Sequence, residues 1–208
     1  MNYNKLSNMV GRSMIEMLGV LAIIGILSVG GIAGYSKAME KFKINKIIEE
    51  YSMLITGLIE YKDNMIKDNN IQLAQFAKDA NLIPETWPNS SSGTFIDDSY
   101  GNTTALYLSN KYIVIDIYFY LNRYTKTSPS KQKYDFCENL FINLAFPLAS
   151  ELQGFFLRVN GATTFYGTKY CNANDRKCLS DLTVAEASKE CRKCIYENTG
   201  DCIAAIVF

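Results

Sequence analysis

The sequence predicts an α+β protein in which a long N-terminal helix packs on an antiparallel β-sheet head. Three observations lead to this fold class. An apolar run near the N-terminus continues without a break into a stretch of helical periodicity. Strand-like segments and a hairpin signal follow beyond residue 100. Cysteines gather in the last third of the chain or just before it, which predicts a disulfide-stabilised C-terminal region.

Composition and charge exclude several classes of function. The chain has 208 residues, with 21 basic and 21 acidic side chains and no histidine. A formal net charge of zero gives no overall attraction to nucleic acid, so no direct nucleic-acid partner is expected. The absence of histidine removes the commonest general base and metal ligand. With no phosphate loop, nucleophile elbow or paired catalytic carboxylates, we expect no enzyme and no cofactor.

The first element is the apolar run at residues 17–33, which contains only apolar or small residues. A helix of about 20 residues crosses the hydrocarbon core of a bilayer. A cleaved secretory signal would have a shorter run followed by a small-residue cleavage site. We therefore expect a membrane-spanning helix.

The amphipathic half of the same helix covers residues 35–69. Its apolar residues recur mostly at steps of three and four, and the first proline of the chain is Pro84. The recurring residues are Ile44, Ile47, Ile48, Tyr51, Leu54, Ile55, Leu58, Ile59 and Tyr61. One continuous helix from about residue 13 to about residue 65 is predicted.

The globular head is expected over residues 70–208. Segments 104–110 and 111–121 are rich in β-branched and aromatic residues and are predicted to be strands. After a polar loop, segment 135–152 has helical spacing, and Pro147 is expected to end or kink that helix.

The last part of the head contains a predicted hairpin at residues 154–171, with Asn160 and Gly161 in its turn. A short helix is expected at 182–194 and a final strand at 202–208.

The cysteines are Cys137, Cys171, Cys178, Cys191, Cys194 and Cys202. An even number predicts up to three disulfides if this region is exported. If the region faces a reducing compartment, the four from Cys171 to Cys194 could instead hold zinc. The polar residues Asn172, Asn174 and Asp175 are interpreted as a hydrophilic turn, with a calcium site as the alternative.

The aromatic residues of the head are interpreted as core or subunit contacts, with stacking on a ligand or DNA as the alternative. They are Tyr112, Tyr118, Phe119, Tyr120, Tyr124, Phe155 and Phe156.

Glu16 lies at the leading edge of the apolar run. An unpaired carboxylate at the bilayer centre costs about 2.5–3.5 kcal/mol on insertion scales. A partner charge would stabilise it, and the candidates are Arg12 or an adjacent chain.

The stretch GRSMIEMLGVLAIIGILS, residues 11–28, resembles the N-terminal signal of type IV pilins and type II secretion pseudopilins. The resemblance implies a leader peptide at residues 1–11 and a transmembrane and assembly helix at 12–34. It places cleavage by a prepilin peptidase between Gly11 and Arg12, with methylation of the new N-terminus at Arg12. Glu16 then becomes the fifth residue of the mature chain, where the family has a glutamate.

This resemblance implies that Glu16 is an assembly residue, pairing with the N-terminal amine of a neighbouring subunit. The expected partners are further copies of the chain, other pilins, the prepilin peptidase and an inner-membrane assembly platform. The expected location is the bacterial inner membrane before assembly, then the periplasm or a cell-surface fibre. The implied function is a type IV pilus subunit for adhesion, motility or DNA transfer; the alternative is a pseudopilin of a type II secretion system.

The order of elements in the head is similar to that of type IVb pilins, and this similarity implies a Cys137–Cys202 disulfide. A bridge between Cys191 and Cys194 would be geometrically awkward, so Cys171 and Cys178 are expected to reach them, although the sequence leaves the pairing open.

Overall fold

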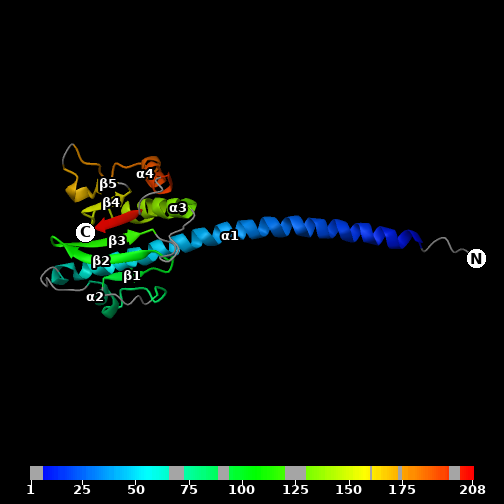
Figure 1. Cartoon of the computed structure of the whole chain (residues 1–208), viewed down its shortest axis with the longest axis horizontal. Coiled ribbons are helices and arrows are strands. Elements are labelled where there is room, and N and C mark those ends of the chain that lie inside the picture. The colour runs from blue at the N-terminus through cyan, green and yellow to red at the C-terminus, as the bar shows by residue number, and fades with distance from the viewer. Residues whose placement is uncertain are drawn as a thin grey trace, which may run out of the picture. The chain divides into compact units, whose positions relative to one another are not determined.

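The computed structural model describes residues 7–65, 73–88, 94–119, 130–159, 161–172, 175–196 and 202–208. The chain divides into two compact units, Met1–Lys43 and Ile44–Phe208 (Figure 1). Helix α1 (Ser7–Met65) contributes to both units. The predicted continuous helix is therefore confirmed, and it begins several residues earlier than the apolar pattern indicated.

The second unit is built on a six-stranded antiparallel sheet with the order β1-β2-β3-β6-β4-β5. The strands are β1 (Phe95–Asp97), β2 (Thr103–Ser109), β3 (Tyr112–Tyr118), β4 (Gly154–Arg158), β5 (Ala162–Tyr166) and β6 (Ile203–Val207). The C-terminal strand β6 pairs with β3 on one side and β4 on the other, so it joins the two hairpins into one sheet. The predicted α+β class is confirmed.

Most predicted elements of the head are present. The two strands at 104–110 and 111–121 form β2 and β3, joined by a turn in which Asn110 and Lys111 have positive φ angles of 49° and 70°. The hairpin predicted at 154–171 forms β4 and β5, with Gly161 at φ 144° in its turn. Asn160, the other expected turn residue, lies outside the described residues.

The helices of the head differ more from the sequence pattern. They are α2 (Leu73–Asp79), α3 (Ser130–Leu140), a π-helical turn (Phe141–Ala145), a 3-10 turn (Thr168–Tyr170) and α4 (Val184–Tyr196). The helix expected at 135–152, with an end or kink at Pro147, begins earlier, at Ser130, changes to π-helical hydrogen bonding at Phe141 and ends at Ala145, just before Pro147. The short elements α2 and β1 were not predicted, because each is too short to show a period.

The main hydrophobic core lies on one face of the sheet. Alternate β3 residues Ile113, Ile115 and Ile117 are fully buried and share one cluster with α1, α3 and α4. In Figure 1 the C-terminal part of α1 lies along β1, β2 and β3. The other β3 residues, Val114 and Asp116, are also buried but lie outside that cluster, so they belong to the opposite face of the sheet.

Candidate functional site

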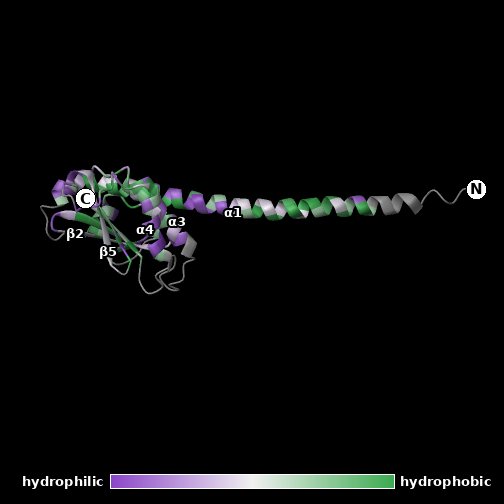
Figure 2. Ribbon diagram, turned by 90° about the horizontal axis from the view of Figure 1, so that it is seen from above, coloured by the Kyte–Doolittle hydropathy of each residue, from purple (hydrophilic) through white to green (hydrophobic). Residues whose placement is uncertain are grey.

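The first feature with functional content is the exposed apolar stretch of α1. Large apolar side chains from Met14 to Ile32 are between 53% and 74% exposed. Figure 2 shows that apolar residues continue around the helix in this part. By length and composition, α1 holds a stretch able to cross a membrane. A helix that is apolar all round requires lipid or other helices around it.

Five glycines interrupt this stretch: Gly19, Gly25, Gly30, Gly31 and Gly34. A Cβ atom added to any of them would meet nothing within 4 Å. No contact with the described residues of the chain therefore requires a glycine at these positions. Small residues on apolar helices allow another helix to approach closely.

Glu16 is exposed and stands between Ile15 and Met17 on α1. It makes no ion pair with any residue whose side chain the structure describes. Gly11 and Arg12 lie within α1, where only the backbone is described, and residues 1–6 of the expected leader lie outside the described residues. Cleavage after Gly11, methylation of Arg12 and a partner for Glu16 therefore stay predictions.

The second half of α1 belongs to the head through its apolar stripe. Eight of its side chains are no more than 3% exposed: Ile44, Ile47, Ile48, Tyr51, Leu54, Ile55, Leu58 and Met65. Burying each such side chain stabilises the fold by about 1.5–3 kcal/mol relative to leaving it in water. The predicted amphipathic half is thus confirmed up to Met65, where α1 ends.

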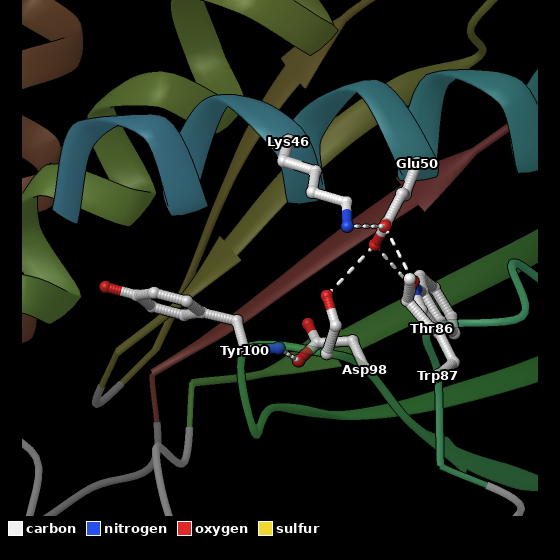
Figure 3. Close-up of polar contacts among 7 residues, drawn as sticks. Lys46, Glu50, Thr86, Trp87, Asp98 and Tyr100 are labelled. Carbon is white, nitrogen blue, oxygen red and sulfur yellow. Dashed lines mark hydrogen bonds and ion pairs between the residues drawn. The ribbon is translucent and has the colours of Figure 1, made fainter. Parts of the chain in front are cut away.

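Glu50 is a buried carboxylate in the same stripe, 4% exposed. It accepts hydrogen bonds from Trp87 Nε1 at 2.7 Å, Thr86 Oγ1 at 2.7 Å and Ser99 Oγ at 3.0 Å. Lys46 Nζ lies 3.9 Å from Oε1 (Figure 3). These donors replace the water that a charged group loses on burial, so the carboxylate connects α1 to the loop before β1 and to the turn after it.

Tyr51 extends this connection to the turn between β1 and β2. Its hydroxyl donates to Asp98 Oδ2 at 2.8 Å and lies 2.6 Å from Thr104 Oγ1. Asp98 also accepts from the backbone N–H groups of Tyr100 and Asn102, and from Asn102 Nδ2. Burial raises the pKa of the Asp98 carboxyl to about 6, although these donors oppose the rise.

The arrangement around Glu50 and Tyr51 has a structural role. Every buried side-chain nitrogen or oxygen in the described part of the chain has a partner. The carboxylates therefore have no orphaned atom aimed at a ligand, and the network fixes the second half of α1 on the sheet. The sequence showed Glu50 only as one of several charges on α1.

All six cysteines form disulfides. The pairs are Cys137–Cys191, Cys171–Cys178 and Cys194–Cys202, with Cα–Cα distances of 5.7, 5.6 and 5.5 Å. The disulfide interpretation is confirmed. The zinc interpretation is not supported, because each sulfur is bonded to another sulfur.

The expected pairing was wrong. Cys137 pairs with Cys191 and not with Cys202, because α3 packs against α4 and brings these two buried residues together. Cys194, one turn further along α4, pairs with Cys202 just before β6. Cys171 and Cys178 close the short loop after β5 instead of reaching α4.

The polar loop between Cys171 and Cys178 was interpreted as a turn with calcium binding as the alternative. Asn174 lies outside the described residues. Among the residues that are described, no three His, Cys, Asp or Glu side chains gather in a way that could hold a metal ion.

The aromatic residues of the head divide between two environments. Phe119 and Phe155 are 2% and 0% exposed in the main core, as predicted. Tyr112, Tyr118 and Phe156 are partly exposed on the opposite face of the sheet. Tyr120 and Tyr124 lie outside the described residues. Alternation along the strands separates the two groups.

Comparison with known proteins found no matching family model, no similar curated protein and no similar solved structure. The architecture of a long N-terminal helix, an antiparallel sheet and three disulfides is therefore described from the structure of this chain and not from a relative.

Proposed function

We propose that this chain is a prepilin-type structural subunit that polymerises through α1 into a type IV pilus. A prepilin peptidase would cleave after Gly11 and methylate Arg12. The observation that carries the proposal is the division of α1. Its first half exposes apolar side chains around a single acidic residue, Glu16, while its second half is buried in a disulfide-stabilised head.

The apolar half needs two successive environments in this proposal. Before assembly, the inner membrane surrounds the exposed side chains between Met14 and Ile32. After assembly, the same side chains pack against the helices of neighbouring subunits. Both environments remove apolar area from water, which is worth about 25 cal/mol per Å².

Glu16 gives the assembly a specific contact. Cleavage before Arg12 creates a new α-amine, and the carboxylate of Glu16 in a neighbouring subunit would pair with it. In an apolar fibre core, a pair is far less costly than either charge alone. The glutamate is thus stabilised once the neighbour is present.

The test is the substitution Glu16→Ala, with Glu60→Ala as the matched control. Both side chains are exposed on α1, but Glu60 lies beyond the apolar stretch. We expect Glu16→Ala protein to reach the membrane and be cleaved, yet to be missing from sheared surface fibres. Glu60→Ala protein should assemble normally. Fibres of Glu16→Ala protein at the wild-type level would contradict the assembly role.

A further inference from the structure

The face of the sheet opposite α1 holds a groove of about 260 Å³. Its floor consists of the small or aliphatic side chains Val114, Ala205 and Val207, and its walls include the aromatic rings of Tyr107, Tyr112 and Phe156. The proposed assembly contacts at Glu16 and the apolar part of α1 do not include the residues of this groove.

The strand register creates the groove. Asp116 on β3 is paired with Ala105 on β2 and with Ala205 on β6, and Ala205 is paired in turn with Phe156 on β4. Residues paired across strands point to the same face. Ala105 and Ala205 therefore flank the Asp116 carboxylate in the middle of the sheet. Their small side chains leave space between the larger aromatic rings that line the groove.

The charge at the groove is carried by Arg158. Asp116 is 3% exposed and accepts a hydrogen bond from the Tyr107 hydroxyl at 2.9 Å. Arg158 Nη2 lies 3.4 Å from both carboxylate oxygens, while the Arg158 side chain is 46% exposed. A guanidinium has five N–H donors, and these long contacts occupy only part of them. The groove thus presents a cation, with the acid buried beneath it.

Other groups at the groove add neutral donors and acceptors. Ser109, Asn110 and Gln153 contribute to its lining. Lys62 Nζ lies 5.8 Å from the ring centroid of Tyr112, which adds a second positive charge near one wall. The site combines aromatic rings, hydroxyl and amide groups and the Arg158–Asp116 ion pair, with the ammonium group of Lys62 near one wall.

We infer that this groove binds a sugar ring that carries a carboxylate, a hexuronic acid. The planar fork of Arg158 matches a carboxylate in a bidentate geometry. The faces of aromatic rings attract the weakly positive C–H groups of a sugar ring. A groove volume of about 260 Å³ leaves room for one hexose-sized ring.

Isothermal titration calorimetry of the full chain tests the inference, in a detergent that has no sugar headgroup. The probes are glucuronic acid and, as its neutral counterpart, glucose. We expect glucuronic acid to bind at least about 10-fold more tightly than glucose, because only the acid pairs with Arg158. Equal binding of the two sugars, or no binding of glucuronic acid, would overturn the inference.

Three variants locate the binding. Arg158→Gln should weaken glucuronic acid binding at least about 10-fold, since it removes the charged hydrogen bonds. Because this change also removes a partner of buried Asp116, Gln153→Ala provides a second variant that leaves Asp116 untouched and should weaken binding of both sugars. Arg192→Gln, which removes an exposed arginine from α4, should bind like wild type.

Two further outcomes would overturn the inference. One is wild-type binding by both Arg158→Gln and Gln153→Ala, with circular dichroism confirming that both are folded. The other is failure to bind glucuronic acid together with loss of self-association in Arg158→Gln, which would make this face an interface between copies of the chain. Neither outcome depends on whether Glu16 acts in assembly, so the two proposals fail separately.

Discussion

At the scale of single residues, Asp98 makes stability depend on pH. Burial raises its pKa from the ordinary 3.8 to about 6 in the folded chain. Between these values the folded state holds a proton that the unfolded state has released, so the unfolding free energy falls as pH rises through this window. A rise of about two pKa units corresponds to about 3 kcal/mol of unfolding free energy. Asp98 contributes this stability below about pH 4, and the contribution is lost above about pH 6.

Asp98→Asn tests this effect by chemical denaturation at several pH values from 4 to 7. Other carboxyl groups titrate in both proteins, so the informative quantity is the difference between wild type and variant. We expect the unfolding free energy of wild type to fall relative to that of Asp98→Asn as pH rises through the window, because only the wild type has a buried carboxyl group that ionises. A difference that stays constant across the range would contradict the raised pKa.

Single residues also show which contacts the sequence could not predict. Glu50 stands three residues after Ile47 and four before Leu54, a spacing that could have identified it as a residue of the buried face, but the sequence pattern was interpreted only as one more charge on α1. Its partners Trp87 and Thr86 could not be foreseen, because they come from an irregular loop. Asp116 reads as one polar residue in a strand, and only the register shows it between two alanines.

At the scale of elements, the long periodic segments were predicted well. The pattern indicated α1, α4, the strands β2, β3 and β6 and the β4–β5 hairpin, because each repeats a helical or strand period or contains a recognisable turn. The disulfide partners were not predictable in the same way. The Cys137–Cys191 pair depends on the packing of α3 against α4, which is a tertiary contact that no local period reveals, and the other two pairs are local ones that the sequence left among several possibilities.

The disulfides should contribute unequally to the stability of the head. The Cys137–Cys191 bridge spans 54 residues, whereas Cys171–Cys178 spans 7. On the chain-entropy estimate, closing these loops stabilises the fold by about 4 and about 2 kcal/mol. Urea unfolding of the two double alanine variants should therefore show the larger loss for Cys137→Ala/Cys191→Ala.

Peptide mapping under non-reducing conditions is the control for that comparison, since it identifies the three pairs directly. A larger loss from removing the Cys171–Cys178 bridge would contradict the loop-length argument. Recovery of a Cys137–Cys202 peptide would contradict the pairing itself.

At the scale of the whole molecule, the two units have different roles in the proposed function. The unit Met1–Lys43 carries the exposed apolar helix and Glu16, which the proposal assigns to the membrane and to the fibre core. The unit Ile44–Phe208 has its own core, sheet and disulfides. The groove on the open face of its sheet adds a separate binding surface to the proposed structural role.

The most direct measurement is the intact, non-reduced mass of the chain from sheared surface material and, separately, from membranes. The account predicts a chain that begins at Arg12, about 14 Da heavier from methylation and about 6 Da lighter from three disulfides, and abundant in the sheared fraction. Processed chain found only in membranes would favour the pseudopilin alternative. A chain that still begins at Met1 and has free thiols would contradict the account.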